Sequence, residues 1–290
     1  MILLMSCNNP LYELEEQACR DTFLKNAEGA NISYWFYKGL DENHSAQTLD
    51  IETHTLYLPV PDGLAGTGRK TVAAMKAALS EDWDYLIKTN VSTYLHIDNI
   101  VKAVKTWEGK DDHNIYGGTF LINDASKDIP FPRGHITIFS RSLVEGLLTY
   151  ADKLAYSDKM PHTDDTLISL TLLYYIHKDL GERYQDKLKE VPTIRAWSEY
   201  ALTDPFLDNV FAVRCKNEED KERTPDNMRR LHKALKKGRK RNLVWFKSPD
   251  KYETGIGNMS YDEYATTKKM IRLLKSYKEQ LKKPDNPTDS

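Results

Sequence analysis

Cysteine is scarce in this chain of 290 residues, and the three that are present, Cys7, Cys19 and Cys215, lie far apart in the sequence. This number and spacing argue against both a disulfide framework and the paired thiolates of a structural zinc site. A reducing environment is therefore the simplest expectation, and we predict a cytoplasmic protein.

Long apolar runs are also missing. No segment approaches the roughly 20 apolar residues that a transmembrane helix needs, so we expect no membrane span. The apolar start, Met1–Met5, has neither the basic flank nor the length of an export signal, and we expect a first strand there. A strong charge of one sign is absent too: the 41 basic and 43 acidic residues give a net charge of −2, which favours no class of partner.

What the chain does contain is an alternation of strand and helix signals through its first half. Strands are expected at Ile2–Ser6, Ile32–Tyr37, Thr55–Val60 and Tyr85–Thr89, and helices at Leu11–Asn26, Gly68–Leu79 and Ile97–Trp107. Such alternation implies parallel strands joined by crossover helices, and therefore an α/β fold with helices on both faces of the sheet. Two short strands, Ile115–Phe120 and His135–Ser140, are expected to form a mixed-sheet insertion over the site.

The second half begins with predicted helices at Leu143–Leu154 and Thr166–Leu180 and a last strand at Phe211–Lys216. The composition changes near residue 220, which divides the chain into a domain at 1–220 and a basic helical extension at 221–290 with a disordered tail. The extension has a helix predicted at Asn227–Lys237 and a basic patch made of Arg229, Arg230, Lys233, Lys236, Lys237, Arg239, Lys240 and Arg241. A solvated helix face is the ordinary interpretation of this patch, and duplex DNA or an anionic membrane surface are the alternatives.

The strand Tyr85–Thr89 ends in the small polar residues Asn90 and Ser92. Ligands of α/β proteins bind at the carboxyl ends of such strands. Many nucleotide-sugar enzymes carry an Asp-x-Asp pair at this position, whose carboxylates bind a divalent cation that bridges the donor diphosphate. Amide and hydroxyl oxygens are weaker ligands for a hard cation, so we predict no metal ligand here and leave a requirement for Mg²⁺ or Mn²⁺ open.

Several motifs occur in an order that resembles glycosyltransferase family 31, the group of Fringe and β-1,3-galactosyltransferases. The motifs are Lys70-Thr71 near a helix start, Lys88 in the strand before Asn90, Gly117-Gly118-Thr119-Phe120, the run from Gly134 to Ser140, and Asp164-Asp165 ahead of a helix. The resemblance covers roughly residues 2 to 180. The Asn-x-Ser triplet is similar to bacterial and viral, including phage, branches of the family. The resemblance implies a GT-A fold, a Rossmann-like nucleotide-diphospho-sugar transferase, that transfers a sugar from a donor such as a UDP-sugar with inversion.

The resemblance also suggests roles for individual residues. An inverting transfer needs a carboxylate base, for which Asp165 is favoured over Asp164, with His162 a third choice; Asp is also a common helix cap. The predicted donor-binding residues are Ser6, Asn8, Lys70, Lys88, Asn90 and Ser92, and Gly118, Gly134 and His135 would contact the acceptor. Arg214 and Lys216, which alternate along one strand, are expected with Arg223 to replace part of the metal's charge; a solvated edge strand is the alternative.

The acceptor is open at this point. We expect a saccharide, such as an envelope glycan. A phage-type enzyme that glycosylates hydroxymethylated bases would instead use the basic patch to hold duplex DNA and reach an extruded base. A non-catalytic module that binds a sugar or nucleotide is the alternative outside the enzymes.

Overall fold

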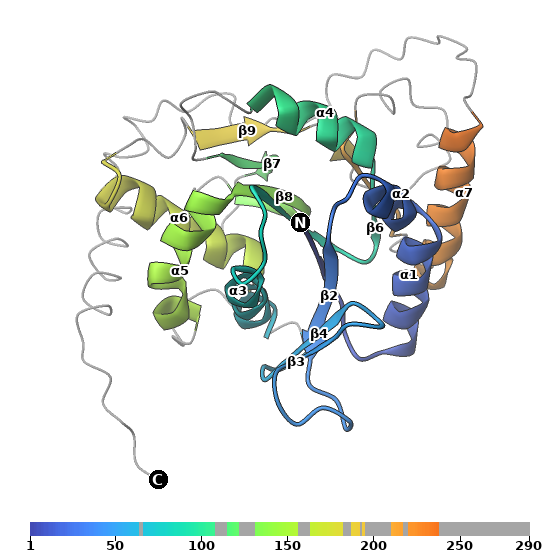
Figure 1. The fold of residues 1–290 in the computed structure, drawn as a ribbon, viewed down its shortest axis with the longest axis horizontal. Coiled ribbons are helices and arrows are strands. Elements are labelled where there is room, and N and C mark those ends of the chain that lie inside the picture. Colours follow the sequence, from blue (N-terminus) through green and yellow to red (C-terminus); the bar gives the residue numbers. More distant parts are fainter. Residues whose placement is uncertain are drawn as a thin grey trace.

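The computed structural model describes residues 1–63, 66–107, 115–121, 131–155, 163–181, 187–191, 193–194, 210–216 and 220–237. Its centre is an eight-stranded sheet with the order β3-β4-β2-β1-β5-β8-β7-β9 (Figure 1). The strands are β1 (Ile2–Met5), β2 (Tyr34–Gly39), β3 (Thr48–Asp50), β4 (Thr55–Leu58), β5 (Tyr85–Asn90), β7 (Tyr116–Leu121), β8 (Phe131–Ser140) and β9 (Leu188–Glu190). β1, β2, β4 and β5 are parallel, whereas β3 and β8 run antiparallel to their neighbours, so the sheet is mixed.

Helices cover both faces of this sheet (Figure 1). One face carries α1 (Pro10–Asp21), α2 (Phe23–Gly29), α4 (Ile97–Trp107) and α7 (Thr224–Lys236), and the other carries α3 (Thr67–Ala78), α5 (Arg141–Ala155) and α6 (Asp164–Lys178). The alternation within β1 explains the two layers: Ile2 and Leu4 belong to one buried apolar cluster and Leu3 to the other. The predicted α/β fold, a mixed sheet flanked by helices, is confirmed.

A second, three-stranded sheet has the order β10-β11-β6, formed by β10 (Thr193–Ile194), β11 (Ala212–Arg214) and β6 (Thr93–Leu95). The predicted last strand, Phe211–Lys216, therefore pairs outside the central sheet. Its Arg214 lies opposite Thr93 in antiparallel register, which brings the carboxyl end of β11 beside the residues that follow β5.

Two expectations about individual elements are wrong. The helix predicted at Leu11–Asn26 is divided at Thr22, whose hydroxyl donates to the Ala18 carbonyl at 2.6 Å and whose backbone leaves the helical conformation. The strands predicted as an insertion over the site belong to the central sheet, because β8 pairs along β5 from Tyr85–Ser140 to Thr89–Ile136.

The described part of the basic extension packs against the α/β domain. Met228 and Leu231 of α7 are fully buried in the cluster that contains α1. Arg229 joins the same two helices through an ion pair with Asp21 at 2.9 Å. The boundary predicted at residue 220 therefore falls just before a helix that shares the core of the domain. No helix in the described parts of the chain is long and apolar enough to cross a membrane.

Candidate functional site

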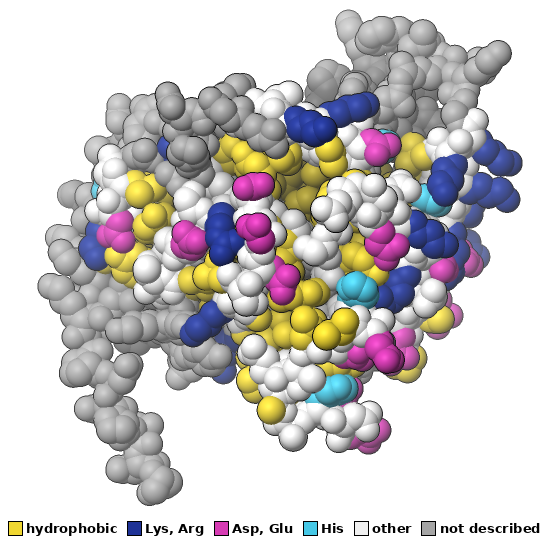
Figure 2. Space-filling model, in the orientation of Figure 1, with side chains coloured by type: hydrophobic (Ala, Val, Ile, Leu, Met, Phe, Trp, Pro, Cys, Tyr) yellow, Lys and Arg dark blue, Asp and Glu magenta, His cyan; other side chains and the backbone are white. Residues whose placement is uncertain are grey.

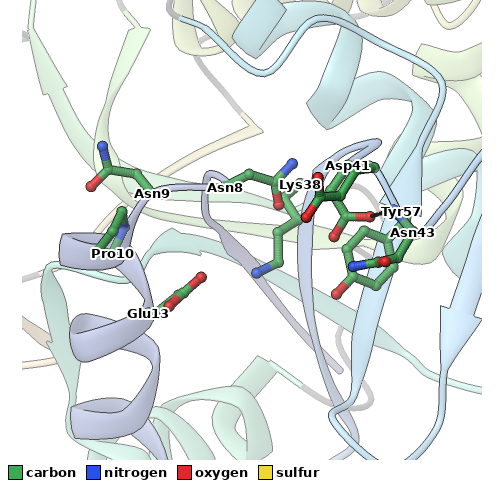
Figure 3. Close-up of a pocket in the computed structure, with 9 residues that line it drawn as sticks. Asn8, Asn9, Pro10, Glu13, Lys38, Asp41, Asn43 and Tyr57 are labelled. Carbon is green, nitrogen blue, oxygen red and sulfur yellow. Dashed lines mark hydrogen bonds between the residues drawn. The ribbon is translucent and has the colours of Figure 1, made fainter.

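A pocket of about 420 Å³ opens at the carboxyl ends of β1, β2 and β4. Its lining residues come from the loop after β1, the start of α1, the end of β2, the loop after β2 and the end of β4: Asn8, Asn9, Pro10, Glu13, Lys38, Asp41, Glu42, Asn43 and Tyr57. Figure 3 shows Pro10 and Glu13 on one side, Asp41, Asn43 and Tyr57 on the other, and Lys38 between them. The predicted donor residue Asn8 thus borders a pocket, and its amide donates to the carbonyls of Gly39 and Leu40 at 3.0 and 3.1 Å.

The charges in this pocket favour a polar, uncharged ligand group. The only cation in its lining, Lys38, donates to Oε1 of buried Glu16 at 3.1 Å, and the Ser6 hydroxyl donates to the same oxygen. The lining also holds the carboxylates of Glu13, Asp41 and Glu42. Carboxylates repel phosphate but accept hydrogen bonds from hydroxyl and N–H groups, as in a ribose or a base.

Beside the pocket, Asp62 holds three segments together. Its carboxylate accepts hydrogen bonds from the backbone N–H groups of Asn8 and Gly39 and from the ammonium of Lys70 at 2.8 Å. Lys70 is fully buried and also donates to the Ser6 carbonyl at 2.6 Å. Lys70, predicted to contact the donor, thus fixes the loop after β1 by internal contacts.

Asn90, at the end of β5, makes only internal hydrogen bonds. Its Nδ2 donates to the Gly134 carbonyl at 3.2 Å, and its Oδ1 accepts from the hydroxyls of Ser92 and Thr93 at 2.8 and 2.7 Å. Both lone pairs of Oδ1 are therefore engaged. In addition, no group of three or more His, Cys, Asp or Glu side chains suited to a metal ion occurs among the described residues. These donors do not fit the divalent cation that an Asp-x-Asp pair would hold.

Next to Asn90 lies a buried cluster of charges at the start of α6. The ammonium of Lys88 forms an ion pair with Oδ2 of Asp164 and donates to the Gly134 carbonyl at 3.4 Å. A Cβ at Gly134 would lie 3.5 Å from Oδ2 of Asp165 and 3.6 Å from the Lys88 nitrogen, so all four residues meet here. Burial and the charge of Asp164 raise the pKa of Asp165, while Lys88 opposes the rise.

Arg214 is the last residue of β11 in the second sheet, and Lys216 follows two residues later. The backbone N–H of Cys215 between them donates to the Ser92 carbonyl at 2.9 Å. Both cations act on buried Glu15 of α1, whose pKa is raised to about 7 by burial in spite of them. The strand that carries them therefore lies beside the polar end of β5, and their contact with a donor stays a prediction. Arg223, the third predicted cation, is largely exposed and pairs with Asp220 at 2.7 Å.

The predicted acceptor residues differ in their surroundings. Gly134 belongs to the charged cluster. Gly118 is buried in β7, and a Cβ there would collide with Pro132 of β8, so close strand packing already accounts for this glycine. His135 is buried, with Nε2 2.9 Å from the Thr193 hydroxyl and its carbonyl accepting from Thr89 at 2.6 Å. The contact between His135 and Thr193 of β10 joins the two sheets.

The described part of the basic patch lies on α7. Arg230, Lys233, Lys236 and Lys237 are exposed, and Lys and Arg side chains gather along the right-hand edge of Figure 2, where Figure 1 places this helix. Arg229 is paired with Asp21 and with Asp226. Arg239, Lys240, Arg241 and the alternative base His162 lie outside the described residues.

The sequence interpretation missed Asp62, Glu16 and Lys38. Asp62 had a usable signal, since it follows Pro61 directly after a predicted strand, where polar residues reach the carboxyl edge of a sheet. Glu16 had none, because a helical glutamate between two polar residues, Glu15 and Gln17, is ordinarily solvated.

Neither a protein-family model nor a curated protein matches this chain. Among solved structures, a glycosyltransferase involved in the glycosylation of the major capsid of PBCV-1 is similar over 78% of this chain and 98% of its own, with a TM-score of 0.42 and 7% identity. An active-site mutant of LgtC is similar over 81% of this chain and 95% of its own, with a TM-score of 0.43 and 12% identity. At this distance neither similarity assigns a family or an activity, and membership of glycosyltransferase family 31 stays a prediction.

Proposed function

We propose that this protein is a glycosyltransferase that moves a sugar from a nucleoside diphosphate donor, such as a UDP-sugar, to an acceptor hydroxyl. The observation that carries the proposal is the position of the Asp165 carboxylate, at one sheet edge with a pocket for a polar group and with two cations. A donor has three parts that match these features: a nucleoside for the pocket, a diphosphate for Arg214 and Lys216, and a sugar whose reacting carbon meets the base.

In the proposed reaction the acceptor oxygen attacks the anomeric carbon and forms the new glycosidic bond. Asp165 takes the hydroxyl proton, and the bond between that carbon and the diphosphate oxygen breaks, with its electron pair leaving on the nucleoside diphosphate. A single displacement of this kind inverts the anomeric configuration. The raised pKa of Asp165 supports its role, because a base with a pKa nearer the working pH accepts a proton more readily.

The charge that develops on the leaving diphosphate needs a positive partner. Fixed cations near a departing phosphate stabilise that charge, and Arg214 and Lys216 beside the end of β5 are suited to do so. Because the side chains of Asn90 and Ser92 are neutral and bonded to each other, no step of this proposal is routed through a metal ion.

The test is turnover of a panel of UDP-sugars, measured as nucleoside diphosphate release and as transfer to saccharide acceptors, with Mn²⁺ and with EDTA. We expect turnover that EDTA does not change and that Asp165→Asn abolishes. Strict dependence on Mn²⁺ would contradict the role of the cations. Donor binding without any turnover would favour the non-catalytic module, and no binding of any nucleotide sugar would overturn the proposal.

A saccharide is the proposed acceptor, and duplex DNA with modified bases is the second candidate. The exposed lysines of α7 favour this second candidate, because they could bind DNA phosphates. Binding that neutralises phosphates releases counterions, so DNA affinity should fall steeply with salt. No binding to duplex DNA at low salt would exclude this candidate. Vesicles of anionic lipid, assayed in parallel, test the alternative of peripheral membrane contact.

A further inference from the structure

The ion pair between Lys88 and Asp164 makes the two neighbouring carboxylates of α6 unequal. Lys88 is 1% exposed and Asp164 6% exposed, and the pair is formed between β5 and the first residue of the helix. Asp165 follows in the sequence, and its Oδ2 lies toward Gly134 of β8, 3.5 Å from where a Cβ on that glycine would stand. One carboxylate is therefore bound to a buried cation, and its neighbour is held close without being part of that pair.

We propose that Lys88 is a positioning residue that binds Asp164 and thereby leaves Asp165 as the carboxylate that receives the acceptor proton. This inference rests on the proposed function and assigns Lys88 a role other than donor contact. Its ammonium is buried and is already bound by Asp164 and by the Gly134 carbonyl. It is therefore not placed to contact a donor phosphate.

The charges around Asp165 make the proposal testable, because they predict the direction in which each substitution shifts the pKa of Asp165. Asp164 acts on Asp165 as a like charge and Lys88 as an opposite charge. Asp164 also acts on Tyr37 of β2. Its hydroxyl is bonded to Thr71 at 3.0 Å, and burial raises its pKa well above the usual value, so it stays neutral. Removal of Lys88 or of Asp164 should therefore shift the ionisation of Asp165 in opposite directions.

A base must be ionised to act, so activity rises with pH through the pKa of Asp165. In Lys88→Met the carboxylate loses its cation, and this acid limb should move to higher pH by about 1 unit, the low end of what a neighbouring charge produces. In Asp164→Asn the cation remains without the competing anion, and the limb should move to lower pH by a similar amount. The double variant lacks both charges, and its limb should lie between those of the single variants.

Carboxyl ¹³C NMR of Asp165 in the same variants gives a readout that needs no turnover and separates this inference from the proposed function. Lys178→Met is the matched control, because Lys178 pairs with Asp179 just past the other end of α6 and is exposed. We expect opposite shifts in the two single variants and none in the control. Shifts in the same direction, or an unchanged titration, would overturn the inference. Opposite shifts in a protein without transferase activity would uphold the charge arrangement and reject the proposed function. If Lys88→Met fails to fold, the double variant, which buries no lone charge, is compared with Asp164→Asn. An equal pKa of Asp165 in these two variants would overturn the inference.

Discussion

The ammonium of Lys70 lies 2.8 Å from Oδ1 of Asp62, and the lysine side chain is fully buried while the aspartate side chain is 22% exposed. The same carboxylate accepts hydrogen bonds from the backbone of Asn8 and Gly39, so one ion pair fixes the ends of β1 and β2 together. The walls of the candidate pocket depend on this arrangement.

Lys70→Met should destabilise the protein strongly, since it leaves Asp62 and the Ser6 carbonyl without their cation. Breaking a buried ion pair costs about 3–5 kcal/mol, whereas an exposed pair contributes about 1 kcal/mol or less. Urea unfolding of Lys70→Met and of Lys178→Met, which breaks an exposed pair, measures the difference. Equal losses in the two variants would mean that the Asp62 contacts do not hold the pocket.

Arg214→Met should weaken binding of UDP by roughly tenfold, the effect of losing one charged hydrogen bond. Uridine lacks the diphosphate, so its affinity should change little. Lys216→Met should behave in the same way, and Lys105→Met, on the exposed side of α4, serves as the control. Calorimetric titration with both ligands makes the comparison. An equal loss of UDP and uridine affinity would place the cations away from the phosphates.

Glu15→Gln should make stability less dependent on pH. The pKa of Glu15 is raised from 4.5 to about 7, so the folded state disfavours the ionised carboxylate. The resulting penalty is absent below pH 4.5, grows as the pH rises toward 7 and is constant above it; its full size is roughly 3 kcal/mol. The variant should therefore match the parent in unfolding free energy at pH 4.5 and exceed it at pH 8. A constant difference across this range would contradict the shift.

Gly134→Ala should reduce transfer while leaving the fold intact. The added methyl group would lie 3.5 Å from the Asp165 carboxylate and 3.6 Å from the Lys88 nitrogen, which is ordinary contact. It would occupy the space in which we place the reacting groups. Gly118→Ala provides the comparison. Its methyl group would collide with Pro132, so this variant should have a lower melting temperature than the parent. If Gly134→Ala retains full activity, the reaction does not take place beside Asp165.

Leu231→Ala should destabilise the whole domain. The side chain is fully buried between α7 and the rest of its apolar cluster, and truncation of such a leucine costs about 2–5 kcal/mol. Lys233→Ala, on the exposed face of the same helix, should have little effect. Thermal unfolding tests this expectation, and Leu231→Ala should unfold in one transition at a lower temperature than the parent. A separate early transition in Leu231→Ala would instead support a boundary at residue 220.

The sequence predicts the local elements well where an apolar run has polar residues at both ends. β5 and α4 are found within one residue of their predicted ends. Asn90, the last residue of β5, shares the Gly134 carbonyl with Lys88 of the buried charged cluster. The break at Thr22 is not predictable in this way, since the helical pattern of apolar residues continues through it.

Pairings between distant residues are harder to predict than elements. Lys88 lies 76 positions before Asp164, and the local sequence around either residue does not predict that the two form an ion pair. The pairing of β11 with β6 likewise joins two strands that are far apart in the sequence, beside the end of β5. The sequence therefore indicates which residues reach the sheet edge, while their division into paired and unpaired charges needs the three-dimensional arrangement.

The contact between α1 and α7 has a consequence for biosynthesis. Arg229 and Asp21 are separated by 208 positions, so the side of α1 that faces α7 stays uncovered until α7 has been synthesised. Contacts of this sequence separation slow folding and leave hydrophobic surface open to aggregation or chaperones in the meantime. Nascent chains stalled before α7 should bind a trigger-factor type chaperone, and chains released beyond it should not.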